Sequence, residues 1–595
     1  TGGLFVLPNF TSHDFGEVGD IGSSKQFNLY NYRNTPITIS SITFGTSSFT
    51  TNTSFPMIIE PLETGIINID ANNSTTEIVN DNMELISEDF PDGISITLSV
   101  MGTEGDVLNG NLFGSYDIAT YRISGDLNIA EGDTAYLHGG TQFLFDGQYN
   151  FNIQGTLKAI GTEIDSIIFD NYGEEKWRGF TLENASDETE FEYVRIYGAE
   201  KYNGGGMYLL SSDPTLTHVT ITDNTAENYG GGMDLMESNP TLNNVTFSNN
   251  TVGFYGGGIS LSGSDPTLTH VTIKNNTAGL GGGMHLDSSD PTLTNVTISN
   301  NTANNSGGMF VSTSNPTLTH VTIANNTAYY GGGMRLSSSN PILTHVTITD
   351  NNADYGGGIY LNSNSNPILT HVTIANNTGS DGGGMYVYSS NPTLTHVTIA
   401  NNTAGNDGGG MYLYYSNPTL THFTIANNTA GNDGGGMYLY YSNPILTNSI
   451  IWGNSPESIY LSSGTPLITY SNIEDGFEGE GNINTNPLFN DDYTLHPLSP
   501  CIDAGTTDIG GYADITEYCG EAPDMGAYEF ITEDCEESTL SGDLNGDGLI
   551  NVLDVVVLVN IVLGSSEPVD AGDLNGDGVL NVLDVVMLVN IILNG

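Results

Sequence analysis

The sequence predicts a mainly β protein in which a parallel β-helix solenoid lies between an N-terminal β-sandwich and a small C-terminal helical module that binds calcium. Three observations predict this order. A repeat of 25 or 26 residues fills residues 204–450, apolar–polar alternation marks residues 1–104, and two acidic loops lie within residues 541–595. Residues 105–203 are expected to hold less regular opening coils, and residues 451–535 the closing coils and a cap.

The repeat sets the architecture. Its Gly-Gly-Gly is followed by a Met or Ile, and successive copies of that residue are 25 or 26 positions apart, at 207, 233, 259, 284, 309, 334, 359, 385, 411 and 437. A fixed period in the twenties indicates a solenoid. Met-x-Leu and Leu-x-x-Val-x-Ile alternate between turn residues, which predicts strands and leaves no window for a helix. Two or three strands in a coil of about 25 residues suit a parallel β-helix.

The repeat also predicts which side chains point inward. Met411, Leu413, Leu420, Phe423 and Ile425, with their counterparts in other coils, should form a dry core. A recurring Asn should hydrogen-bond both the turn backbone and the next Asn of a ladder. It stands at 224, 250, 276, 301, 326, 351, 377, 402 and 428.

Composition narrows the range of partners. Lys and Arg number 10 against 69 Asp and Glu, a formal net charge of −59, which disfavours nucleic acid and anionic membranes and favours divalent cations. No apolar run reaches about 18 residues, so no transmembrane segment is expected. No signal-peptide pattern stands at the start, and the chain is expected to begin at a processed end. We expect a secreted protein at the cell surface.

Three cysteines lie in one short region, at Cys501, Cys519 and Cys535. They lack the paired C-x-x-C spacing of a zinc site. One disulfide is expected, with Cys519 and Cys535 as the favoured pair and one thiol left over. Export is compatible with such a bond and is not required by it.

The first 104 residues are predicted to form a β-sandwich. Phe27-Asn-Leu29-Tyr-Asn31 and Pro36-Ile37-Thr-Ile39 alternate apolar and polar residues between turns. Together with Asp14-Phe15-Gly16-Glu-Val18-Gly19 and Ile59-Glu-Pro61, they resemble immunoglobulin-like domains of the ASPM/SPD-2/Hydin type. The resemblance implies a binding or spacing domain.

Segments on either side of the repeat indicate the handedness of the coil. Gly155-Thr-Leu157-Lys-Ala159 and Trp177-Arg-Gly179-Phe180 resemble the opening coils of secreted right-handed β-helix proteins of the pectate-lyase-like superfamily. Ser499-Pro-Cys501-Ile-Asp503 and Asp524-Met-Gly526-Ala-Tyr528-Glu529 resemble their closing segment. The repeats themselves are similar to those of polymorphic outer-membrane adhesins.

Two loops near the C-terminus carry the strongest local motif. Oxygen side chains at loop positions 1, 3, 5, 9 and 12, with Gly at position 6 and a backbone carbonyl at position 7, suit a hard calcium ion. We expect two bound ions and two helices, 555–563 and 585–593. The predicted ligands are Asp543, Asn545, Asp547, Leu549, Asn551 and Asp554 in the first loop, and Asp573, Asn575, Asp577, Val579, Asn581 and Asp584 in the second.

The tandem loop-and-helix pair resembles a type I dockerin over residues 541–595. A dockerin has Asp at position 12, as here, where an ordinary EF-hand has Glu. The resemblance implies docking onto a cohesin, a β-sandwich module of another protein or of another copy of this chain. The residues that match the recognition positions are Val552, Leu553, Val582 and Leu583. They are apolar where many dockerins carry Ser or Thr, which leaves partner choice open.

The repeats offer few residues for catalysis. Lyases of this fold need a cationic base beside a carboxylate–calcium cluster, and hydrolases need grouped carboxylates. The only Lys and Arg of residues 202–460 are Lys274 and Arg335, more than two coils apart. Asp234, His285 and Arg335 make a polar strip at outward positions, which is either a site or, by preference, ordinary surface variation. We expect a non-enzymatic chain.

A row of histidines shares one slot of the repeat, at 218, 270, 320, 345, 371, 396 and 422. Imidazoles in a row can bind transition metals. Asn244, Asn295 and Asn448 occupy the same slot in other coils, and Asn is a poor ligand for such metals, so a role at a corner of the coil is preferred. The Asn-x-Thr triplets leave glycosylation open.

Tyrosines gather in the last coils. Two outward columns are predicted to form an exposed aromatic surface, suited to a protein partner or, as the second choice, to sugar rings. The columns are Tyr360, Tyr386, Tyr412 and Tyr438, and Tyr388, Tyr414 and Tyr440.

These expectations combine into an extracellular structural or adhesion protein. A rigid β-helix rod would be attached through a calcium-dependent dockerin, or assembled head to tail into a filament. The alternative is a carbohydrate-binding or polysaccharide-degrading component delivered to a cohesin-bearing complex.

Overall fold

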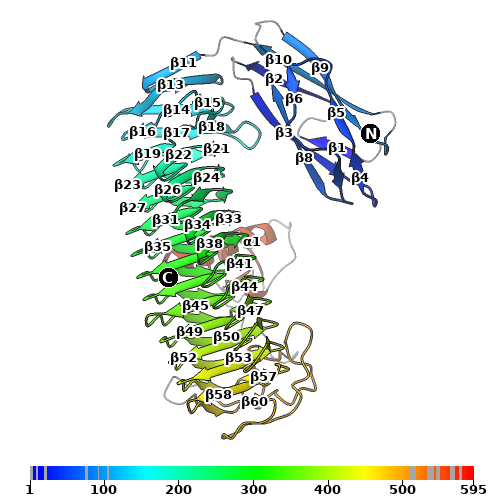
Figure 1. Ribbon diagram of the computed structural model, residues 1–595, viewed down its shortest axis with the longest axis vertical. Coiled ribbons are helices and arrows are strands. Elements are labelled where there is room, and N and C mark those ends of the chain that lie inside the picture. Colours follow the sequence, from blue (N-terminus) through cyan, green and yellow to red (C-terminus); the bar gives the residue numbers. More distant parts are fainter. Residues whose placement is uncertain are drawn as a thin grey trace. The chain divides into compact units, whose positions relative to one another are not determined.

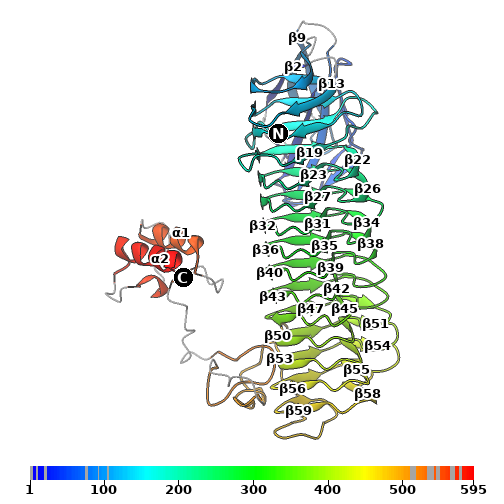
Figure 2. The same ribbon diagram turned by 90° about the vertical axis from the view of Figure 1, so that its left-hand side faces the viewer.

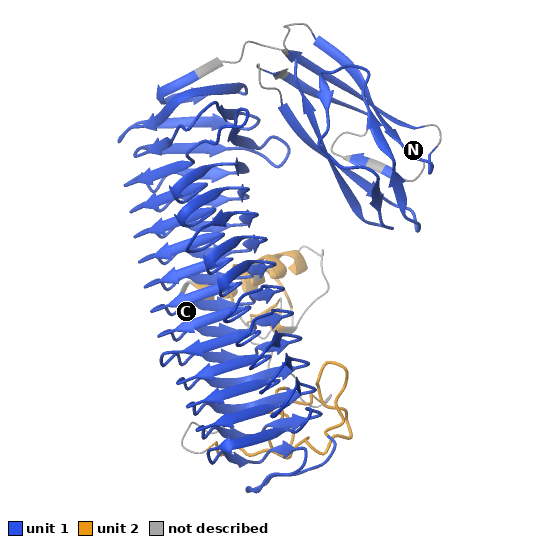
Figure 3. Ribbon diagram, in the orientation of Figure 1, with its two compact units in different colours: residues 1–486 blue, residues 487–595 orange. Residues whose placement is uncertain are grey.

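A computed structural model describes residues 4–7, 11–18, 23–73, 78–90, 93–102, 106–509, 518–531, 542–544, 550–562, 570–574 and 579–594. Two compact units divide the chain, residues 1–486 and residues 487–595 (Figure 3). The chain is mostly β, with a parallel β-solenoid in the first unit and two short helices in the second, as the sequence predicts. The described residues include no helix long and apolar enough to cross a membrane.

The N-terminal segment forms two four-stranded sheets and one strand pair. Their facing sides bury a separate apolar core that includes Phe27, Leu29, Ile67 and Leu98, each 0% exposed. In strand β3, buried residues alternate with more exposed ones, so one face of the strand points into this core. The sheet orders are β1 (Leu4–Leu7), β3 (Ser23–Asn31), β8 (Thr64–Ala71), β6 (Phe49–Thr50); β2 (Ser12–Val18), β10 (Ile94–Gly102), β9 (Ile78–Ile86), β5 (Ser41–Thr43); and β4 (Ile37–Ile39) with β7 (Met57–Ile59).

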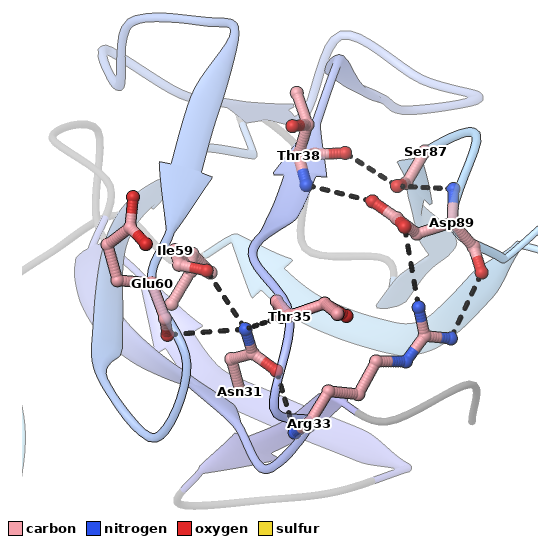
Figure 4. Close-up of polar contacts among 8 residues, drawn as sticks. All are labelled: Asn31, Arg33, Thr35, Thr38, Ile59, Glu60, Ser87 and Asp89. Carbon is pink, nitrogen blue, oxygen red and sulfur yellow. Dashed lines mark hydrogen bonds and ion pairs between the residues drawn. The ribbon is translucent and has the colours of Figure 1, made fainter.

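Polar side chains close the loops at one end of these sheets (Figure 4). The buried amide of Asn31 donates to the carbonyl oxygens of Thr35, Ile59 and Glu60 at 2.9, 2.9 and 3.2 Å. Asp89 accepts from the Thr38 backbone at 3.0 Å and forms an ion pair with Arg33 at 3.4 Å. The buried Asn31 amide and the half-buried Asp89 carboxylate are thereby paired, as polar groups packed against a core require.

Less regular strands open the solenoid. Large rings fill its interior here: Phe145 stacks on Trp177 at 4.3 Å between ring centroids, and Phe151 stacks on Phe180 at 5.2 Å. The strands are β11 (Asp106–Asn111), β12 (Gly114–Tyr116), β13 (Thr120–Ile129), β14 (Thr134–His138), β15 (Gln142–Phe145), β16 (Phe151–Ile153), β17 (Thr156–Ile160), β18 (Ile167–Asn171), β19 (Phe180–Glu183), β20 (Glu190–Glu192) and β21 (Val194–Tyr197).

Most regular coils then contribute three short strands that pair in parallel, in register, with those of the next coil (Figures 1 and 2). In two coils the second and third strands are continuous, as β50 (Thr393–Ala400) and β53 (Thr419–Ala426). The second strands run from β24 (Thr215–Thr217) to β59 (Leu467–Thr469), and the third from β25 (Thr220–Thr222) to β60 (Asn472–Ile473). The first strands, which follow the glycines, are β23 (Met207–Leu210), β27 (Met233–Met236), β31 (Ile259–Ser262), β35 (Met284–Asp287), β39 (Met309–Ser312), β42 (Met334–Ser337), β45 (Ile359–Asn362), β49 (Met385–Tyr388), β52 (Met411–Tyr414), β55 (Met437–Tyr440) and β58 (Ile459–Ser463).

A fourth group of strands lies between the third strand of one coil and the glycines of the next. It forms two small parallel sheets, separate from the large one. The first contains β22 (Glu200–Asn203), β26 (Thr225–Tyr229), β30 (Thr251–Val252), β34 (Thr277–Leu280) and β38 (Thr302–Asn305); the second contains β48 (Thr378–Gly379), β51 (Thr403–Ala404) and β54 (Thr429–Ala430).

The interior confirms the predicted core and Asn ladder. Met411, Leu413, Leu420, Phe423 and Ile425 are all 0% exposed. The ladder Asn residues are buried, and each side chain donates to the next ladder Asn and to a backbone carbonyl. These bonds satisfy turn groups that the strands leave unpaired.

Four corners with a left-handed backbone bend each regular coil. In the coil that begins at Gly408, φ is positive at Gly408 (68°), Tyr415 (51°), His422 (46°) and Asn427 (56°). Gly adopts this conformation without cost, and Asn, Asp and His adopt it more readily than other side chains do. The corner conformation therefore explains why His and Asn share one slot of the repeat.

The second unit contains the cysteine region and two helices, α1 (Val552–Val562) and α2 (Val582–Asn594). Cys519 is disulfide-bonded, and Cys535 lies outside the described residues. Both helices begin three residues earlier than the sequence predicted. Asn551 precedes α1 and its N–H donates to the Asp554 carboxylate at 2.8 Å, a capping bond that extends the helix back to Val552.

Candidate functional site

Buried carboxylates mark the ends of the two predicted calcium loops. Asp554 and Asp584, at the last loop position, are 0% exposed although they lie in the first turns of α1 and α2. Asp554 accepts from the Leu544 backbone at 2.8 Å, and Asp584 accepts from the Leu574 backbone at 3.1 Å. One oxygen of each carboxylate thus fastens its helix to the start of its own loop.

The remaining predicted ligands are only partly described. Asp543 is 9% exposed, and Asp573, Asn551 and Asn581 are half-buried. Val579, expected to offer a carbonyl, has an exposed side chain. Asn545, Asp547, Leu549, Asn575 and Asp577 lie outside the described residues.

The donor set fits calcium. The described side chains offer oxygen atoms as metal ligands, which a hard divalent cation requires. The sequence has no Lys or Arg after Arg335, so no cationic side chain of this module offsets the charge of these buried carboxylates. Burying a carboxylate is costly, and a bound cation offsets that cost.

Apolar side chains stand exposed on both helices. Val552 and Val582 occupy equivalent first-turn positions and are each 65% exposed, and Leu583 is 63% exposed. Val556 and Val586, one turn further on, are 53% and 52% exposed. Leu553 lies in α1 beside Val552. Of the predicted recognition residues, Val552, Val582 and Leu583 therefore belong to exposed apolar faces, and Val556 and Val586 extend these faces by one turn.

The tyrosine columns differ from a flat exposed surface. In the first column, ring centroids are 5.4 Å apart from Tyr360 to Tyr386, 4.7 Å from Tyr386 to Tyr412 and 4.6 Å from Tyr412 to Tyr438, with interplanar angles of 10–19°. Tyr460 continues this column at 5.2 Å. Its rings are half-buried because each covers the face of the next. Burial accordingly raises the pKa of Tyr386 and Tyr412.

The second column is shorter and more accessible. Tyr414 stacks on Tyr440 at 5.0 Å and 4°, while Tyr388 is tilted by 49°. Tyr415 and Tyr441, which were not among the predicted tyrosines, occupy corners beside this column and are 49% and 52% exposed. Both residues directly follow Met-Tyr-Leu-Tyr, at a corner whose side chain also points outward. That position in the sequence could have identified them. Stacked rings present mainly edges and hydroxyl groups, whereas stacking against a sugar needs a free face.

Asp234 and His285 of the polar strip are buried, and Arg335 is half-buried. Asp234, Ser260, His285, Phe310 and Arg335 are neighbours in register across five first strands. Asp234 and His285 are 3% and 6% exposed. Burial raises the pKa of Asp234 to about 7 and lowers the pKa of His285 to about 4. The Tyr255 ring, from the coil before His285, covers it at 4.8 Å.

Arg335 is enclosed by aromatic rings. Its guanidinium carbon lies 5.3, 5.1 and 5.5 Å from the ring centroids of Phe310, Tyr330 and Tyr360, and Nη1 donates to Asn305 at 3.0 Å. Lys274 is exposed at the end of β33 (Thr272–Lys274), a third strand of another coil. The two basic groups are not brought together.

The histidine slot forms stacked rings at a corner. Centroids are 4.8–4.9 Å apart in the run His320, His345, His371, His396 and His422, with interplanar angles of 16° or less. Parallel rings direct their nitrogen lone pairs side by side and not toward a common point. Among the described residues, no group of three or more His, Cys, Asp or Glu could hold a metal ion.

Comparison with known proteins agrees with the repeat and the loops. A family model described as the right handed beta helix region matches residues 154–328, 317–429 and 395–486. A model of the type I dockerin domain matches residues 541–593. No curated protein matches the chain.

Solved structures match weakly. A protein of unknown function from Porphyromonas gingivalis W83 is 14% identical over 16% of this chain and 46% of its own, with a TM-score of 0.15. The secreted serine protease VesC from Vibrio cholerae is 10% identical over 16% and 22%, with a TM-score of 0.14. The pectate lyase Pel9A is 14% identical over 66% and 88%, with a TM-score of 0.25. The chain spans less than half the length of the first two.

Proposed function

Because the chain belongs to the right-handed β-helix family and carries a type I dockerin domain, we propose that it is an extracellular structural component, a β-helix rod attached through a calcium-loaded dockerin to a cohesin module. The cohesin belongs to another protein or, in a head-to-tail filament, to another copy. The observation that carries the proposal is the pair of exposed first-turn faces of α1 and α2, each beside a fully buried loop carboxylate.

Calcium controls docking in this proposal. Asp554 and Asp584 tie the helix starts to the loops, so neutralising them by calcium fixes the two apolar faces in place. Exposed Val and Leu side chains on a folded module of this size suit a protein partner that buries them. The near-identical halves offer the partner two equivalent ways to bind.

The rod is proposed to be non-catalytic. A lyase needs a free cationic base, and Arg335 is instead packed against three rings. Hydrolysis needs two carboxyl groups facing one bond, and Asp234 is buried beneath its neighbours. The likeness of the N-terminal sheets to ASPM/SPD-2/Hydin domains, and of the repeats to adhesins, remains a prediction that suits a spacing and display role.

The test is binding of the full chain to purified type I cohesin modules, followed by size-exclusion chromatography with light scattering. We expect a complex with equal numbers of the two proteins in calcium and none after chelation. The chain alone, at high concentration in calcium, tests self-assembly: growth in mass with fibres in negative-stain images indicates the filament, and a monomer indicates a separate partner.

Matched variants make the test specific. Val552→Asp combined with Val582→Asp should abolish binding while the helices remain folded by circular dichroism, because a charge in each face prevents burial. Asn560→Ala, an exposed polar position on α1, is the control and should bind normally. A double variant that binds as tightly as the parent chain would contradict docking through these faces.

A further inference from the structure

Four tyrosines meet at one edge of the last regular coils. Tyr414 and Tyr440 end the paired strands β52 and β55, and Tyr415 and Tyr441 occupy the corners that follow. The ring centroids of Tyr415 and Tyr441 are 5.0 Å apart, and their planes differ by 6°. Each also contacts its sequence neighbour edge to face, at 4.8 Å for Tyr414 and Tyr415 and at 4.6 Å for Tyr440 and Tyr441.

The backbone fixes the Tyr415–Tyr441 pair. Both residues have a left-handed backbone, with φ of 51° and 49°, and the Tyr415 N–H donates to the Tyr440 carbonyl at 3.0 Å. The two side chains therefore leave equivalent corners one coil apart and project in the same direction. In the preceding coil this corner is Ser389, so the corner stack ends at Tyr415 on that side.

We propose that Tyr415 and Tyr441 are a modification site, at which peroxide-driven one-electron oxidation joins their rings into a dityrosine cross-link between adjacent coils. The rings are 49% and 52% exposed, so an oxidant in solution reaches them. They are parallel with centroids 5.0 Å apart, so two phenoxyl radicals formed there meet without diffusion.

The reaction balances with hydrogen peroxide as the oxidant. Each phenol loses one electron and one proton, and the two radicals form one carbon–carbon bond between ring positions next to the hydroxyl groups. Both rings then lose the hydrogen at the bonded carbon and regain their hydroxyl groups. Overall, two tyrosines and one hydrogen peroxide give one dityrosine and two water molecules.

The cross-link would reinforce the solenoid at its most tyrosine-rich coils. It joins positions that lie 26 residues apart in the sequence, and so lowers the conformational entropy of the unfolded state. The inference does not depend on the dockerin, because it concerns residues of the rod alone.

The experiment treats the full chain with a peroxidase and hydrogen peroxide at low protein concentration and measures dityrosine fluorescence and mass. Reduction of the disulfide followed by cyanogen bromide cleavage then maps the bond. Met411 and Met437 are 0% exposed and so protected from peroxide, and cleavage after them separates the Tyr415 fragment, residues 412–437, from the Tyr441 fragment, residues 438–525. The expected product joins these two fragments, has lost two hydrogen atoms and comes from monomeric protein.

Variants decide whether the stacked pair is responsible. Tyr415→Phe and Tyr441→Phe should each lower the dityrosine yield several-fold and remove the joined fragment. Tyr136→Phe, which changes a 49% exposed tyrosine elsewhere on the solenoid, should leave the yield unchanged. Absence of dityrosine in the parent chain, its restriction to dimers, or an undiminished joined fragment in either Phe variant would each overturn the proposal.

Discussion

Asn402 donates both its backbone N–H and its side-chain amide to the same oxygen of Asn428, each at 2.9 Å. The Asn402 amide also donates to the Ile374 carbonyl at 2.9 Å, and its own oxygen accepts the same two bonds from Asn377. One side chain thus links three coils inside the buried core. Such a ladder is cooperative, because each amide is polarised by its neighbours.

Replacing this side chain should therefore weaken more than one coil. We expect Asn402→Ala to cost about 2–4 kcal/mol, since it leaves the buried donors of Asn377 and the Ile374 carbonyl without partners. Thermal unfolding followed by circular dichroism measures the loss. Asn432→Ala, at an exposed turn position, is the control, and equal stability of the two variants would contradict a structural role for the ladder.

The middle glycine of the triplet should tolerate no side chain. A Cβ built on Gly383 would lie 2.6 Å from the Gly409 carbonyl oxygen, which belongs to the backbone of the next coil and cannot move aside. Gly383→Ala should lower the unfolding temperature by several degrees, at a cost of about 1–3 kcal/mol. Gly405→Ala, whose Cβ would meet nothing closer than 3.7 Å, should behave like the parent chain.

Acid should destabilise the histidine corner. Burial, and secondarily His396, lowers the pKa of His422 to about 3. Because the folded pKa is below that of an unfolded histidine, near 6.5, stability from neutral His422 is present above pH 6.5 and is lost as the pH falls toward 3. His422→Asn should lose less stability than the parent chain over this range. His138→Asn, at an exposed site, should follow the parent curve.

A rise in pH should destabilise the folded chain through Asp234, the carboxyl group of the polar strip. Burial raises the pKa of Asp234 to about 7. Stability from its protonated form is present below the unfolded pKa, near 4, and is lost as the pH rises through 7. The difference in unfolding temperature between Asp234→Asn and the parent should therefore increase in favour of the variant from pH 5 to pH 8. A difference that is the same at both values would contradict the buried assignment.

Calcium removal should unfold only the dockerin. Chelation should abolish the helical signal of α1 and α2 while the β signal of the solenoid persists, because the rod's core and ladders include no loop carboxylate. Asp554→Ala with Asp584→Ala should reproduce the effect in the presence of calcium. Isothermal titration calorimetry gives the number of bound ions, which is expected to be two. A double variant that still bound two calcium ions would contradict the ligand assignment.

Much of the fold could be predicted because its local rules repeat. The spacing of Met411 and Leu413 predicts which side chains are buried, and the recurrence of Asn402 predicts an inward ladder. Two further ladders were not recognised. The buried Ser416 hydroxyl accepts from the Ser390 backbone at 3.2 Å, and Asn391, before a proline, accepts from Asn417 at 2.7 Å. Ser and Asn-Pro are ordinary turn residues, so their sequence pattern does not distinguish a ladder from an exposed turn.

The sequence by itself determined the period of the coil and its core, because each depends on residues a few positions apart. The tertiary structure decided what the outward positions face. Asp234 and Tyr360 hold the same slot of the repeat, yet one is buried and the other packs against Arg335. The difference arises because the side chains that contact an outward position come from adjacent coils and from the fourth strand group, whose side chains vary from coil to coil. Alternation along a strand gives the direction of a side chain but not what covers it.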